Sequence, residues 1–131
     1  MKILSQRDPL WSNIHIGKSN TTVGKYGCLI TNESAITAEI KNYHDPGWMA
    51  QNLDFTKDGL FIWASIIKVK LDFVYRFYYQ DDAKIKKAFA DPDQFVILQV
   101  DKKHWVWLIG VRGGYRVMDP YYGDVIPIGK R

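Results

Sequence analysis

The chain has 131 residues, the length of one domain, and 47 % of them are apolar and 15 % aromatic, enough for a sizeable core. The net charge is +4, and a single cysteine means that no internal disulfide can form, so the fold does not depend on an oxidising compartment. These totals exclude a disordered or low-complexity chain and predict a single globular domain over residues 1–131.

The N-terminal sequence MKILSQRDPLW contains too short an apolar run for a signal peptide, and no later run reaches transmembrane length. We therefore expect synthesis in the cytoplasm without a signal peptide, and no membrane insertion. Lysines gather only modestly, at 84–87 and 102–103, with no arginine-rich stripe and no nucleic-acid-binding motif. The positive charge is therefore expected to serve solubility rather than nucleic-acid binding.

The first part of the chain, to Tyr26, is rich in Ser, Asn, Thr and Gly and is expected to be an extended loop. A helical pattern begins at Cys28, with Gly27 in the cap position. Its apolar residues are spaced seven, four and three apart and predict one buried face: Leu29, Ile36, Ile40 and Tyr43. The sequence HDPG is expected to end this helix, because proline cannot continue it.

The middle of the chain predicts two short helices and one strand. DPGWMAQNLDF (45–55) is expected to start a short helix with proline in its first turn. Residues 59–67 are apolar and fit either a helix or a strand, whereas KLDFVYRFYY (70–79) has the β-branched and aromatic content of a strand. A helix follows, with Asp81 or Asp82 as its cap and an apolar side formed by Ile85, Ala88 and Phe89.

The last part of the chain predicts an antiparallel sheet. QFVILQV (94–100), HWVWLIGV (104–111) and YRVMD (115–119) are apolar runs joined by the short turns DKK and RGG. Helices followed by such a sheet are typical of the α+β class.

Cys28 has the placement of a nucleophile, because the first amides and the dipole of a helix favour a thiolate. A lone cysteine is also commonly a small buried apolar residue. A nucleophilic thiol needs a base, for which the chain offers three histidines. His104 begins a buried strand, His15 lies in the N-terminal loop, and His44 lies at the far end of the Cys28 helix, about 24 Å from its start.

Two further residues complete a candidate constellation. Asp119 follows His104 by fifteen residues (119 − 104) and ends the next strand, so its carboxylate is placed to orient the imidazole. Gln6, in the N-terminal loop, can donate its amide to a developing oxyanion. Each has a structural alternative: Asp-Pro is a common strand end, and a loop glutamine is usually a surface residue.

In this order, the residues resemble the C39-like branch of the papain-like cysteine peptidases. The resemblance rests on LSQRDPLW, TTVGKYGCLITNESAI, FVILQVDKKHWVWLIGV and YRVMDPYYG, whereas residues 54–79 match poorly. It implies a papain-like fold, with N-terminal helices packed on a C-terminal antiparallel sheet. It also implies a nucleophile, a base, an orienting carboxylate and an oxyanion donor, which are Cys28, His104, Asp119 and Gln6 respectively.

The chain departs from that family's pattern at two places. The family often has Ser or Thr and then Met after its cysteine, where this chain has Asn32 and Ile36. Gln6 lies 22 residues before Cys28 (28 − 6), farther than in the most compact members.

The resemblance implies a cysteine peptidase that hydrolyses an amide bond. For a small, basic domain without disulfides, the expected substrate is a stem or cross-bridge peptide of peptidoglycan, cut at the bacterial cell wall by a monomeric enzyme of the phage lysin or tail type. The alternatives are a protein-processing peptidase, or a non-catalytic binding or inhibitory module with the same fold. Four aromatic residues are expected to line the substrate groove, with core or loop packing as the alternative: Trp11, Trp48, Trp105 and Tyr121.

No cofactor or metal is expected. One cysteine and three scattered histidines lack the short ligand spacings of a zinc site, and neither glycine-rich phosphate-binding motif occurs.

Overall fold

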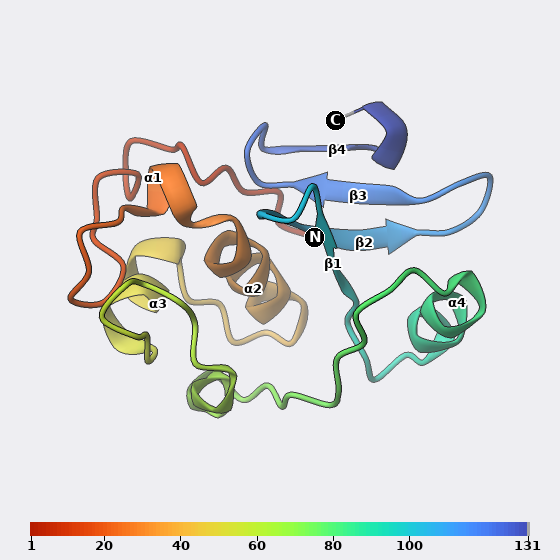
Figure 1. Cartoon of the computed structure of the whole chain (residues 1–131), viewed down its shortest axis with the longest axis horizontal. Coiled ribbons are helices and arrows are strands. Elements are labelled where there is room, and N and C mark those ends of the chain that lie inside the picture. Colours follow the sequence, from red (N-terminus) through yellow and green to blue (C-terminus); the bar gives the residue numbers. More distant parts are fainter. Residues whose placement is uncertain (131) are drawn as a thin grey trace.

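The computed structural model describes residues 1–130 and has an α+β architecture, as the sequence predicts (Figure 1). Four strands form one antiparallel sheet in the order β1-β2-β3-β4. The helical elements are α1 (Val23–Tyr26), α2 (Cys28–Glu39), α3 (Pro46–Asn52), η1 (Trp63–Val69), α4 (Asp82–Ala90) and η2 (Ile128–Lys130). The strands are β1 (Ile97–Val100), β2 (His104–Gly110), β3 (Arg116–Asp119) and β4 (Asp124–Pro127). No helix within residues 1–130 has the length and apolar character needed to cross a lipid bilayer.

Helix α2 lies at the centre of the molecule, between α3 and the sheet (Figure 1). Nine of its twelve residues are buried, polar ones included, so the predicted single apolar face is wrong. The helix also ends at Glu39, before HDPG, and Tyr43 lies exposed beyond it. A helix covered on several sides buries most of its surface, and its buried polar side chains normally form hydrogen bonds inside the protein. Ser34 does so by donating its hydroxyl to the His44 carbonyl at 2.5 Å.

The sheet is covered on both faces. Trp107 and Met118 pack against Ala35 and Ile36 of α2. On the opposite face, the apolar side chains of β2 and β3 pack against Ile85 of α4. Helices from the N-terminal part therefore pack on the C-terminal sheet, and α2 is held directly against the strand that begins at His104.

Several local predictions are confirmed. Helix α3 begins as predicted, with Pro46 in its first turn; its cap, which was not predicted, is Asp45, which accepts a hydrogen bond from the Trp48 amide at 2.7 Å. Asp81, the first of the two candidate caps, accepts from the Lys84 amide at 3.1 Å and begins α4. The ambiguous segment 59–67 contributes to the 3-10 helix η1.

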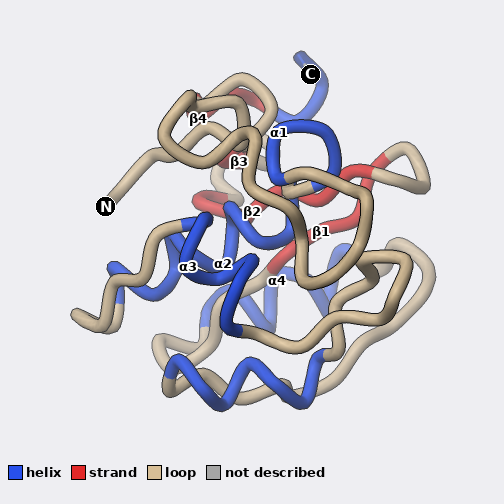
Figure 2. Tube along the Cα trace, turned by 90° about the vertical axis from the view of Figure 1, so that its left-hand side faces the viewer, coloured by secondary structure: helices blue, strands red, loops and turns tan. Residues whose placement is uncertain are grey.

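Other local predictions are wrong. Residues 70–79 form no strand; they lie in one of the long loops that run across the molecule (Figure 2). Their rings pack on side chains instead, as Phe73 does against Trp63 at 5.2 Å between centroids. The loop expected up to Tyr26 ends in the short helix α1, and strand β4 was not predicted.

Candidate active site

Cys28 is the first residue of α2, where the unpaired amides of the helix favour a negatively charged sulfur. The preceding Gly27 links α1 to α2 in very little space. A Cβ atom at this position would lie 2.5 Å from the Val23 carbonyl oxygen, so only glycine fits. The close turn at Gly27 therefore sets the direction in which α2, and with it the thiol, enters the core.

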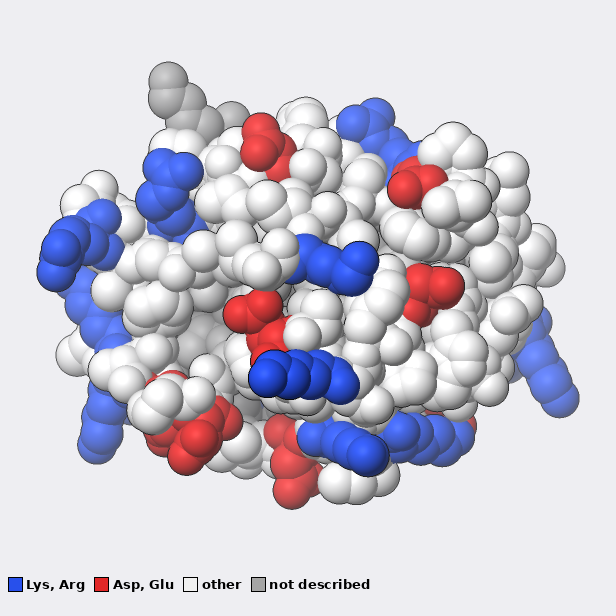
Figure 3. Space-filling view, turned by 180° about the vertical axis from the view of Figure 1, so that it is seen from behind, with Lys and Arg blue, Asp and Glu red and all other residues white. Residues whose placement is uncertain are grey.

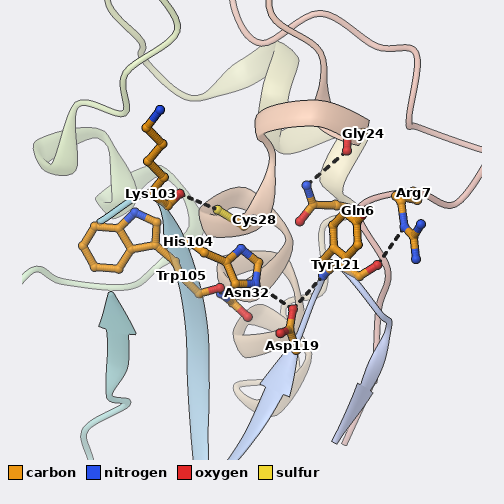
Figure 4. A network of polar contacts seen from close by, with 10 residues as sticks. All are labelled: Gln6, Arg7, Gly24, Cys28, Asn32, Lys103, His104, Trp105, Asp119 and Tyr121. Atoms are coloured by element: carbon orange, nitrogen blue, oxygen red, sulfur yellow. Dashed lines mark hydrogen bonds and ion pairs between the residues drawn. The ribbon is translucent and has the colours of Figure 1, made fainter. Parts of the chain in front are cut away.

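His104 connects the thiol to Asp119. The imidazole Nε2 lies 2.7 Å from Asp119 Oδ1, which leaves Nδ1 as the ring nitrogen available to Cys28. Figure 4 shows the ring between the sulfur and the carboxylate, with that nitrogen turned toward Cys28. The antiparallel pairing of β2 with β3 brings His104 and Asp119 together, as their spacing predicted.

Asp119 is itself held in place. Only 1 % of it is exposed, and its Oδ1 also accepts a hydrogen bond from the Tyr121 amide at 3.0 Å. A buried carboxylate with fixed partners orients an imidazole well, because its position does not vary with solvent.

The surroundings of His104 change its basicity. Burial disfavours the charged ring, but hydrogen bonds to Asp119 and Cys28, together with the negative charge of both groups, outweigh that effect. The pKa of His104 is raised from 6.5 to about 9. At neutral pH the imidazolium form of His104 is therefore favoured, and it faces a sulfur at the N-terminus of a helix.

The thiol of Cys28 is buried. Cys28 is 6 % exposed, and its sulfur lies 3.9 Å from the Lys103 carbonyl oxygen, in the turn before β2. The burial reflects the contact of α2 with β2, which brings thiol and imidazole together.

Gln6 is buried, which corrects the view of it as a surface glutamine; it is 3 % exposed. Its backbone amide donates to the Pro120 carbonyl at 2.8 Å, and its side-chain Nε2 donates to the Gly24 carbonyl at 3.1 Å. Gln6 thus joins the residue after Asp119 to the short helix before Cys28. Its Oε1 is buried and has no hydrogen-bond partner among the described residues. The second N–H of that amide takes no part in the bond to Gly24.

The four aromatic residues expected in a substrate groove are distributed differently. Trp11 is buried in the hydrophobic core, with Nε1 donating to the Ser5 carbonyl, so core packing describes it better. Trp48, on α3, stacks on His44 with ring centroids 4.1 Å apart. Trp105 and Tyr121 are close in sequence to His104 and Asp119, and Figure 4 shows both beside the candidate site.

Asn32 helps to hold the candidate site together, a role that the sequence did not indicate. Its side-chain Nδ2 donates to the Trp105 carbonyl at 2.9 Å and so ties α2 to β2 next to His104. The sequence marked Asn32 only as a departure from a family pattern. Asn32 is buried because other elements cover α2 on several sides, and this is visible only in the fold.

No group of three or more histidine, cysteine or acidic side chains within residues 1–130 is arranged to hold a metal ion. No protein-family model, curated protein or solved structure matches this chain. The chemistry of the site is therefore inferred from its own geometry.

Proposed function

We propose that the protein is a cysteine peptidase of the papain-like, C39-like type. One observation carries the proposal: a single imidazole lies between the only thiol, at the start of α2, and a buried carboxylate at the end of β3. These three groups come from distant parts of the chain. Acyl transfer through a thioester requires this spatial arrangement, in which a base lies between the nucleophile and the group that orients the base.

In the proposed reaction, the Cys28 thiolate attacks the carbonyl carbon of an amide bond and forms a tetrahedral oxyanion. The oxyanion collapses as the C–N bond breaks, and the His104 imidazolium gives its proton to the leaving amine. Water then attacks the thioester while His104 accepts its proton. The acid product leaves, and the thiolate–imidazolium pair is restored.

The oxyanion is proposed to receive hydrogen bonds from the Cys28 backbone amide and from the free N–H of Gln6. Both are held before the reaction begins: the first by the start of α2, the second by the contact of Gln6 with Gly24. Donors fixed in advance stabilise developing charge without reorganising.

The proposed substrate is a stem or cross-bridge peptide of peptidoglycan, which carries carboxylate groups. The chain has a net charge of +4, and the basic residues Arg7 and Lys103 lie beside the candidate site (Figure 4). On the face drawn in Figure 3, basic side chains are interspersed with acidic ones. Positive charge near the site favours the approach of an acidic substrate.

The test is incubation with purified peptidoglycan, followed by mass analysis of the released fragments. Wild-type protein is expected to release peptides with new amino termini, while Cys28→Ala and His104→Ala release none. Iodoacetamide at pH 6 separates the alternatives, because a thiolate already formed reacts faster than free cysteine. A reactive thiol without release of peptides supports a protein-processing peptidase, and an unreactive thiol supports a non-catalytic binding module.

A further inference from the structure

A cavity lies next to the candidate active site and shares Trp105 with it. It has a volume of about 720 Å³ and is bounded by α2, η1, β1 and the loop at residues 70–80. Neither Cys28 nor His104 lines it. Its size is within the range of small-molecule binding sites. Much of its wall is aromatic, including Trp63, Phe73, Tyr75 and Trp105.

The wall of this cavity contains a buried carboxyl group. Glu33, in the middle of α2, is 2 % exposed, and neither of its carboxyl oxygens has a hydrogen-bond partner among the described residues. Burial raises the pKa of Glu33 well above its usual range. A buried acid that pairs with nothing destabilises a fold, and such groups in proteins are normally paired or hydrogen-bonded. Because this carboxyl group has no partner among the described residues, its burial points to a partner from outside the chain.

The other charged residues of the wall do not supply that partner. Lys70, Asp72, Arg76 and Asp93 also line the cavity, but all four are exposed. Arg76 directs its guanidinium over the rings of Tyr78 and Trp105, at 4.7 and 5.2 Å from the centroids. No histidine is among the lining residues. Among the described residues that line this wall, Glu33 is therefore the one buried side chain that can carry a charge.

We propose that this cavity binds a ligand with an aromatic or aliphatic body and a primary ammonium group, and that Glu33 is the counter-ion of that group. The apolar body is held by burial against the aromatic wall, and the ammonium group pairs with the carboxylate. Because both oxygens of Glu33 are covered, the ammonium contacts them only after a side chain of the wall shifts. Binding therefore includes a local rearrangement.

The probe is phenethylamine, compared with 2-phenylethanol, which has the same ring and a neutral polar group. Binding is followed through tryptophan fluorescence, since Trp63 and Trp105 line the cavity. At pH 8 the amine is expected to bind the wild-type protein at least about ten times more tightly than the alcohol. This preference should grow as the pH rises, because only ionised Glu33 attracts the ammonium and burial raises the pKa of Glu33.

Glu33→Gln should remove the preference for the amine. Glu39→Gln is the matched control, since Glu39 ends the same helix, lies outside this cavity and is about one third exposed. Equal binding of amine and alcohol by wild-type protein overturns the proposal, and this comparison holds even if Glu33→Gln fails to fold. Cys28→Ala should bind phenethylamine as the wild type does. Binding and peptide hydrolysis are thus judged separately.

Discussion

Replacing Asp119 by alanine is expected to lower the pKa of His104 and to weaken catalysis without abolishing it. The pKa of His104 is raised from 6.5 to about 9, which corresponds to about 3 kcal/mol in favour of the imidazolium. Asp119 supplies the strongest of the favourable interactions, a hydrogen bond, and also a negative charge. Removing both should lower the pKa by at least about 1 unit.

The measurement is a titration of the histidine ring protons by NMR in wild-type protein and in Asp119→Ala. Asp119→Asn is the matched control: it retains an oxygen that can accept from Nε2 but has no charge, so its pKa should fall between the other two. Peptide release should decline less in Asp119→Ala than in His104→Ala, because the carboxylate positions the base and does not accept the proton.

Two results would refute this reasoning about Asp119. One is a His104 pKa that stays near 9 in Asp119→Ala. The other is an equal and complete loss of activity in Asp119→Ala and His104→Ala while both remain folded.

Cys28→Ala should abolish hydrolysis. It should lower the free energy of unfolding by no more than about 1 kcal/mol, because one missing sulfur leaves a gap of about methyl size. A larger loss of stability in a urea titration would mark Cys28 as a structural residue. Gln6→Ala should reduce kcat by roughly 10²–10³-fold while iodoacetamide still reacts rapidly with the thiol, and an unchanged kcat would exclude the oxyanion role. The raised pKa of His104 stabilises the fold fully below pH 6.5. The free energy of unfolding should therefore fall as the pH rises from 6.5 to about 9, and a flat profile in urea titrations would contradict the pairing of His104 with Asp119. Because the pKa of buried Glu33 is raised, folded wild-type protein should lose stability as the pH rises above about 4.3. Glu33→Met should therefore be more stable by about 1–3 kcal/mol at pH 8, and a less stable variant would show that the carboxyl has a stabilising partner.

Predictions that depend on local chemistry agreed with the structure. Pro46 and the capping side chain of Asp81 begin helices through contacts within three residues, so the sequence alone is sufficient to place them. The same holds for His104 and Asp119, because two short turns leave adjacent antiparallel strands little choice of register.

Predictions that depend on what covers a segment failed. Residues 70–79 have the composition of a strand, yet a strand needs a neighbouring backbone, and here the rings of this loop pack on other side chains, such as Trp63. The periodicity of α2 indicated a helix with one buried face, but that helix lies between α3 and the sheet, so Asn32 and Glu33 are buried as well.

The sequence by itself therefore determined the α+β class, the start of α2 at Cys28 and the strand ends that carry His104 and Asp119. These follow from steric and hydrogen-bonding preferences within a few residues. Only the tertiary structure decided that Gln6 is buried between Pro120 and Gly24, and that Glu33 lies without a partner in the wall of a cavity. Burial depends on contacts between residues far apart in the chain, and no local pattern specifies which side of a helix the rest of the protein will cover.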